Sequence, residues 1–163
     1  MINRRSALLL TLTLALSACG FKLKGLYEVP ESLQQLVLVE QSVQPTDLGR
    51  ELVNQLSGSG VAISERAPYR LELGKPSYNK RALTISARAE ALEYELNASV
   101  SFALYQGSSE TPVLEREVSA ERSFDENTNS VALESLENRY RIELNRALAD
   151  QIVRQYLSYA PAN

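Results

Sequence analysis

The chemistry open to this chain is limited first by the side chains that it lacks. It has no histidine, so no imidazole can act as a general base or bind a metal, and its one cysteine excludes an internal disulfide. An enzyme would have to use carboxylate, lysine, tyrosine or serine. Two clusters of acidic residues stand out, Glu90-Glu93-Glu95 and Glu110-Glu115-Glu117. Their spacing is more typical of the solvent-exposed face of a strand than of a catalytic carboxylate pair. We therefore expect no enzymatic activity, no catalytic residue and no metal site.

The single cysteine, Cys19, follows a segment with the features of a bacterial export signal. Asn3-Arg4-Arg5 is positively charged, residues 7–16 are apolar apart from two threonines, and Leu16-Ser17-Ala18 places small residues directly before the cysteine. Ten helical residues reach about 15 Å, half of a bilayer core, so this segment is a signal and not a membrane span. The pattern is typical of a lipobox, in which the cysteine thiol is acylated and the leader is cut away.

This interpretation predicts that residues 1–18 are removed and that residues 19–33 form a lipidated tether. Two acyl chains already anchor a protein stably to a membrane, so three acyl chains on Cys19 would hold it permanently. Gly20, where an aspartate commonly marks retention in the inner membrane, favours the periplasmic leaflet of the outer membrane of a Gram-negative bacterium. No cofactor is expected besides this covalent lipid. The alternative is an ordinary secretory leader followed by an incidental cysteine.

The overall charge of the processed chain is acidic. The loss of Arg4 and Arg5 leaves 15 basic and 20 acidic residues, a net charge of −5. A protein that binds nucleic acid needs a basic surface to displace counterions, so we expect no nucleic-acid partner.

One stretch is a local exception, because residues 75–89 contain four basic side chains and no acidic one. In a strand, Lys80 and Arg88 would project from the same face, with small and hydroxyl residues between them. Such a face could bind phosphate groups through charge-assisted hydrogen bonds. The alternative is a solvated strand face whose charges discourage aggregation. Tyr78 precedes this face and shares its parity, and the basic candidates are Arg88, Lys80, Arg81 and Lys75.

Hydrophobic periodicity predicts the elements that carry these residues. A short apolar run, Leu36–Val39, is typical of a strand buried on both faces, and Thr46 is a plausible N-cap for a helix that ends before Gly58. Alternation of period two then predicts three further strands. The first covers residues 69–89, with an interruption at Gly74 and Pro76, and the others lie near residues 92–104 and 114–124, with a turn between 88 and 91. A long helix follows over residues 131–159.

This order predicts an α+β fold, a two-layer sandwich with two helices packed on one face of a four-stranded, mostly antiparallel sheet. The predicted organisation is one domain over residues 34–159 and a tail at 160–163.

Several motifs in the chain resemble the LptE family of lipopolysaccharide-assembly lipoproteins. The segment Cys19–Gly25 (CGFKLKG) resembles the start of mature family members, which typically read Cys-Gly-aromatic-x-Leu-basic-Gly. The resemblance covers essentially the whole chain. Shorter matches are Leu71-Glu72-Leu73-Gly74-Lys75, Glu93-Tyr94 and Arg122-Ser123-Phe124, followed by Asn127 and Ala132-Leu133.

The resemblance implies a protein that works through its partners. Family members plug the lumen of the LptD β-barrel in a one-to-one complex, assist the assembly of that barrel and bind lipopolysaccharide on its way to the outer leaflet. It also implies a lipopolysaccharide contact at the tip of the central hairpin, where this chain has Arg88. Some members have a second basic contact early in the last helix, where this chain has Glu134 and Ser135. The alternative function is an adaptor lipoprotein of another envelope system, such as an auxiliary component of a lipid-transporting ABC machine.

Overall fold

The computed structural model of the protein describes residues 29–85, 91–125 and 130–159. Cys19, Arg88 and the predicted tail therefore lie outside the described residues. In chain order the elements are η1 (Glu31–Leu33), β1 (Gln35–Glu40), α2 (Asp47–Gly58), β2 (Ala62–Ile63), β3 (Tyr69–Leu73), β4 (Ser77–Ile85), β5 (Ala91–Gln106), β6 (Leu114–Asp125) and α3 (Ser130–Leu157).

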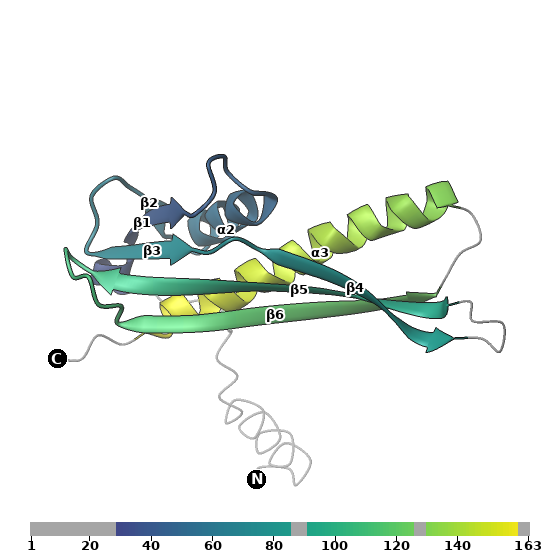
Figure 1. The fold of residues 1–163 in the computed structure, drawn as a ribbon. Helices are drawn as coiled ribbons and strands as arrows, with labels where there is room; N and C mark the ends of the chain where they lie inside the picture. The colour runs from purple at the N-terminus through teal and green to yellow at the C-terminus, as the bar shows by residue number, and fades with distance from the viewer. Residues whose placement is uncertain (1–28, 86–90, 126–129, 160–163) are drawn as a thin grey trace, which may run out of the picture.

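The sheet is organised around β5, its longest strand (Figure 1). Along one edge of β5 lie β3 and then β4, both antiparallel to it, and along the other edge lies β6, also antiparallel. Beyond β3 come β1 and β2, which run parallel to one another, and β1 is also parallel to β3. The predicted hairpin is confirmed as β4 and β5.

The prediction of an α+β fold with two helices is confirmed, but the prediction of a four-stranded sheet is wrong. The sheet has six strands and is mixed. The strands β2, β1 and β3 are parallel because α2, which follows β1 in the chain, acts as a crossover helix and returns the chain to the end of the sheet at which β1 starts. One predicted strand is divided into β3 and β4, which continue one another along β5 and are separated by an irregularity at residues 74–76.

That irregularity is a bulge in the backbone. Leu73 pairs with Phe102 and Ser77 pairs with Ser99, so three residues of one strand face two of the other. The Gly74 amide donates to the Ser101 carbonyl oxygen at 2.9 Å, and a Cβ at position 74 would lie 2.8 Å from the same oxygen. Glycine is required there by close approach of two backbones. The extra residue reverses the parity of the chain, so β4 presents its even-numbered residues where β3 presents its odd-numbered ones.

A single hydrophobic core lies between the sheet and the two helices, which cover the same face (Figure 1). The predicted stripe of α2 is confirmed by the burial of Leu48, Leu52 and Leu56, and Thr46 is its N-cap, accepting from the Gly49 amide at 2.9 Å. The even-numbered residues of β5 from 96 to 104 are buried, as the alternation predicts. No helix among the described residues lies on the other face of the sheet. For this reason β1 is not buried on both faces, and the Val39 side chain stays 40% exposed.

The long helix α3 is buried unevenly along its length. Its C-terminal half contributes Leu144, Leu148, Ile152 and Tyr156 to the core, and the Tyr156 hydroxyl donates to the Leu33 carbonyl at 2.8 Å. The N-terminal half extends beyond α2 towards the end of the sheet formed by β4, β5 and β6 (Figure 1). Its predicted core residues Leu133, Leu136 and Tyr140 are half-buried there.

Candidate functional site

Lys80 lies on the helix-covered face of the sheet. It pairs in register with Leu96, whose side chain is fully buried, and directly opposed residues of neighbouring strands point to the same face. The Lys80 ammonium forms an ion pair with Glu137 of α3. It also lies 4.3 Å from the centre of the Tyr94 ring and 5.5 Å from that of Phe124, within the range of cation–π attraction. Lys80 therefore joins β4 to α3 and is not part of an open strand face.

Two aromatic rings lie within cation–π distance of this lysine, and a third ring, Tyr140, packs against one of them. Tyr94 of β5 and Phe124 of β6 stack with ring centres 5.8 Å apart, and Phe124 lies 5.5 Å from Tyr140 of α3. We call Lys80, Tyr94, Phe124, Glu137 and Tyr140 the basic-aromatic cluster. Of these five residues, the sequence predicts only Lys80 as a site residue. The aromatic members share the inward parity of their strands or the apolar stripe of α3, which indicates core packing but does not reveal that they meet at a cation.

Tyr78, the tyrosine favoured by the sequence, faces α3 as well. Its hydroxyl donates to the Asn145 side-chain oxygen at 2.5 Å, and the Arg141 guanidinium lies 5.0 Å from the centre of its ring. Burial raises the pKa of the Tyr78 hydroxyl, an effect that the Asn145 hydrogen bond and the Arg141 charge partly oppose. The polar end of Tyr78 is thus engaged by α3.

Arg81 lies on the opposite face of the sheet from Lys80. Its Nε donates to the Glu95 carboxylate at 2.7 Å, and this contact holds the pKa of the Arg81 guanidinium above its usual value. The Glu95 residue is only 7% exposed although it faces away from the helices. Arg81 is therefore already paired, while its guanidinium remains largely exposed.

Two of the four basic candidates, Lys80 and Arg81, lie on opposite faces of the sheet. Lys75 is exposed in the bulge between β3 and β4, and Arg88 lies outside the described residues. The register of β4 against β5 shifts between Ala82 and Thr84, so the simple alternation expected from Lys80 to Arg88 is interrupted. A second irregularity follows between Thr84 and Ile85. Irregular pairing of this kind cannot be read from hydrophobic alternation.

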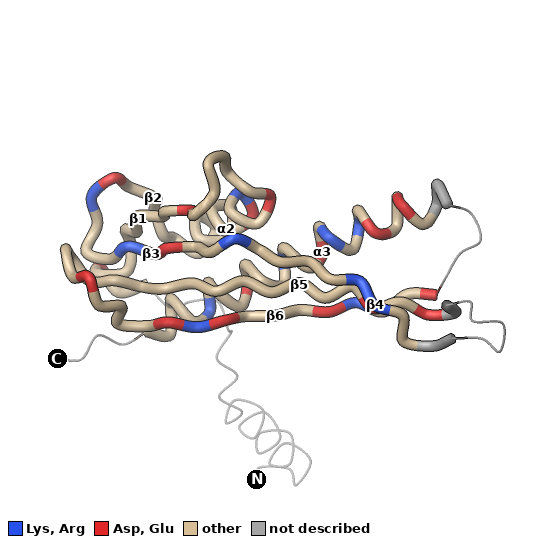
Figure 2. Tube along the Cα trace, in the orientation of Figure 1, with Lys and Arg blue, Asp and Glu red and all other residues tan. Residues whose placement is uncertain are grey.

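The face of the sheet without helices carries small polar and charged residues in cross-strand rows. Ser77, Ser99 and Ser119 form one row, and neighbouring rows contain Asn79, Asn97 and Glu121. Figure 2 shows both acidic and basic residues along β6. We call this surface the uncovered polar face: Ser77, Asn79, Arg81, Asn97, Ser99, Ser101, Glu117, Ser119, Glu121 and Ser123.

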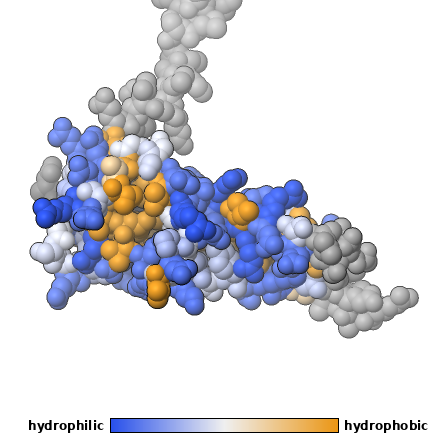
Figure 3. All heavy atoms as spheres, turned by 90° about the horizontal axis from the view of Figure 1, so that it is seen from above, coloured by the Kyte–Doolittle hydropathy of each residue, from blue (hydrophilic) through white to orange (hydrophobic). Residues whose placement is uncertain are grey.

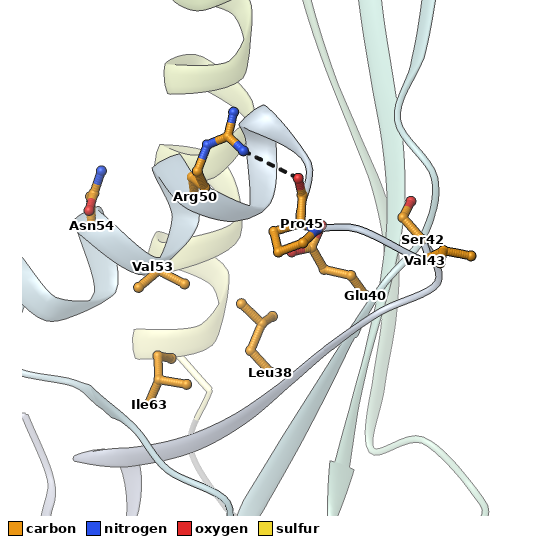
Figure 4. A pocket seen from close by; sticks show the side chains of 9 residues that line it. All are labelled: Leu38, Glu40, Ser42, Val43, Pro45, Arg50, Val53, Asn54 and Ile63. Atoms are coloured by element: carbon orange, nitrogen blue, oxygen red, sulfur yellow. Dashed lines mark hydrogen bonds between the residues drawn. The ribbon is translucent and has the colours of Figure 1, made fainter.

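An apolar groove lies at the other end of the molecule, beside β1, β2 and α2. Its volume is about 570 Å³. Seen from above, apolar side chains gather there on a surface that is otherwise mostly hydrophilic (Figure 3). Leu38, Val53 and Ile63 converge on the groove from β1, α2 and β2 (Figure 4). Its other lining residues are Glu40, Ser42, Val43, Pro45, Arg50 and Asn54.

Two further observations concern only the described part of the chain. It contains no group of three or more metal-binding side chains close enough to hold an ion. Neither of its helices has an apolar stretch of the length that crossing a bilayer demands.

Comparison with known structures places the fold among bacterial lipoproteins. Rare lipoprotein B from Shewanella oneidensis superposes with a TM-score of 0.68 at 21% identity, over 76% of this chain and 94% of that one. A minor lipoprotein from Acinetobacter baumannii gives 0.63 at 24% identity, over 77% and 92% of the two chains. Lipoprotein B from Nitrosomonas europaea gives 0.62 at 19% identity, over 83% and 89%. A search of curated proteins gives no significant match.

The family is shown by the sequence itself. The family model LptE, described as "Lipopolysaccharide-assembly", matches residues 34–156. The chain belongs to the LptE family, a non-enzymatic family of envelope lipoproteins of Gram-negative bacteria that act in lipopolysaccharide assembly. The resemblance in the motifs is thereby confirmed.

Proposed function

We propose that this protein is an outer-membrane lipoprotein that sits in the lumen of an LptD-type β-barrel, helps that barrel to assemble and binds lipopolysaccharide during its insertion into the outer leaflet. The proposal includes a one-to-one complex and an acylated Cys19 in the periplasmic leaflet. The family match over residues 34–156 is the observation that carries it.

The shape and polarity of the sheet support the barrel as a partner. The interior of a membrane β-barrel is polar, whereas its outside presents an apolar band about 25 Å tall. The uncovered polar face offers serine, asparagine and charged side chains suited to such an interior. With 16 residues, β5 is about 50 Å long, enough to extend through a barrel of that height. An ordinary sheet face of this size would be polar too, so the family match over residues 34–156 is the stronger support for a barrel partner.

The basic-aromatic cluster supports a contact with lipopolysaccharide. Lipid A carries phosphates next to acyl chains, and Lys80 offers a cation beside the Tyr94 and Phe124 rings. Its partner Glu137 is exchangeable, because the ion pair is partly exposed and such pairs contribute only about 0–1 kcal/mol. We propose that a phosphate replaces Glu137 at Lys80, with Arg88 and Lys75 as further contacts. Arg81, on the opposite face of the sheet, would make a separate contact. A net acidic chain would bind such a ligand locally and would not attract it from a distance.

Co-purification tests the main part of this proposal. Tagged protein extracted in mild detergent from outer membranes should elute with one copy of a β-barrel partner identified by mass spectrometry. Metabolic labelling with palmitate should mark the protein, and Cys19→Ser should abolish the label. An unlabelled protein that elutes without a barrel would overturn the proposal.

A further inference from the structure

The groove beside β1 opens onto an unpaired part of a strand edge. In a strand, successive residues direct their backbone groups to alternate sides. The Gln34 and Leu36 carbonyls accept from Ala62 and Ser64, whereas the Gln41 amide donates to β3 at Leu73. Even-numbered residues of β1 therefore face β2, and odd-numbered residues face β3.

β2 is too short to cover that edge. It contains two residues and pairs with Gln35 and Leu36, and the last bond across this edge of the described structure goes to the Leu36 carbonyl. The backbone groups of Leu38 and Glu40 thus point to a side on which no described strand continues. The side chains of the same two residues line the apolar groove. The surface combines unused strand hydrogen bonds with a cavity for apolar side chains.

This combination selects an extended polypeptide as its occupant. A peptide backbone supplies alternating donors and acceptors along a strand edge, while alternate side chains enter the neighbouring pocket. A second copy of this chain is disfavoured, because the free edge covers about three residues and a stable dimer buries about 1,200 Å² or more. A site this small binds weakly, so it suits a segment of the same chain, whose effective concentration reaches the millimolar range.

The segment before Val29 has the required sequence and reach. Phe21 and Leu23 alternate with Lys22 and Lys24, so in an extended conformation both apolar side chains would share one side. The Val29 carbonyl accepts from the Gln34 side chain at 3.0 Å, which places the end of the segment beside the start of β1. From Gln34 to Leu38 is about 13 Å of strand, and the connection from Lys24 to Val29 spans up to about 17 Å when extended.

We propose that the segment Phe21–Lys24 adds to the free edge of β1 as a short antiparallel strand and places its apolar side chains in the groove between Leu38, Val53 and Ile63. The antiparallel direction follows because the segment leads back from the start of β1 towards its end. Docking shortens the connection between Cys19 and the folded body and holds the β1 end of the molecule close to the anchoring membrane.

Hydrogen exchange in the full mature chain tests this docking without a barrel or lipopolysaccharide. The variant Phe21→Ser/Leu23→Ser removes the apolar side chains, and Lys22→Ser/Lys24→Ser is the matched control. Equal melting temperatures of the two variants verify that neither alters the core. We expect the amides of Leu38 and Glu40 to exchange at least tenfold more slowly in the parent and in the control than in the Phe21→Ser/Leu23→Ser variant.

Two results would overturn the proposal. Rapid exchange of both amides in the parent would show a free edge. Slow exchange that persists in the Phe21→Ser/Leu23→Ser variant would show a different occupant, a second copy of the chain if the protection disappears on dilution.

Discussion

Lys80 of β4 and Glu137 of α3 form an ion pair across the space between the sheet and the long helix. The two residues are 57 positions apart in the sequence, and they connect the sheet to the N-terminal half of α3, whose apolar residues are only partly buried. The lysine also lies over the Tyr94 ring, so it keeps a favourable environment if Glu137 is lost. Contacts from β5 and α3 therefore hold the Lys80 ammonium in place.

Removing the competing carboxylate should therefore strengthen lipopolysaccharide binding. We expect Glu137→Gln to raise the affinity of the soluble Cys19→Ser form by a few fold, and Lys80→Met to lower it by a similar factor. Unfolding free energies should change by less than about 1 kcal/mol in Glu137→Gln, because the pair is partly exposed. Binding of labelled lipopolysaccharide to immobilised protein measures both effects.

The matched control for this experiment is Arg116→Gln, which removes one positive charge from an exposed position of β6. It should leave the affinity unchanged. If Lys80→Met and Arg116→Gln lower the affinity equally, then net charge and not the basic-aromatic cluster governs binding.

Tyr156 should make the protein sensitive to alkaline pH. Burial, and to a smaller extent the nearby Tyr69, raises the pKa of the Tyr156 hydroxyl to about 12 from about 10. Below pH 10 the tyrosine is protonated in both states, so it adds no pH dependence. Between pH 10 and 12 the unfolded chain ionises while the folded chain does not, and this residue should reduce the unfolding free energy by about 2–3 kcal/mol over that range.

The variant Tyr156→Phe separates this effect from the hydrogen bond to Leu33. At pH 7 it should be less stable by about 1 kcal/mol, because the Leu33 carbonyl loses its donor. Above pH 10 its stability should fall less steeply than that of the parent. Urea unfolding at a series of pH values measures both slopes, and parallel slopes would show that Tyr156 does not ionise preferentially in the unfolded chain.

The backbone contact at Gly74 should be sensitive to a single methyl group. Gly74→Ala would bring a Cβ to 2.8 Å from the Ser101 carbonyl oxygen, and we expect a loss of about 1–3 kcal/mol in unfolding free energy. The control is Gly58→Ala in the last turn of α2, where no atom lies within 4 Å of the new Cβ. It should gain about 0.5–1 kcal/mol from helix propensity. A stable Gly74→Ala variant would show that the bulge can relax.

The elements with strong local signals could be predicted from the sequence. Thr46 and the stripe that follows it predict α2, and the alternation of β5 and β6 predicts their inner face. These features depend on near neighbours in the chain, where propensity and periodicity act. The same holds for the lipobox, whose pattern is entirely local and whose acylation stays a prediction.

The details of the sheet and of the site could not be predicted in this way. The parity of β4 depends on a one-residue bulge at Gly74, and the alternation alone gives no sign of the register shift after Ala82. As a result the sequence assigns Lys80 to an open face, whereas the tertiary structure pairs it with Glu137. The contact between Lys80 and Glu137 depends on how α3 packs on the sheet, which local sequence patterns do not determine. The strand β2 is not predicted because its two residues are too few to show a periodic pattern.

The most direct test of the central claim is the mass and composition of the complex extracted from the outer membrane. The account predicts that the acylated protein elutes in a one-to-one complex with an LptD-type β-barrel and that cells depleted of the protein lose folded barrel. Recovery of the protein alone, or with components of a lipid-transporting ABC machine in place of a barrel, would contradict it.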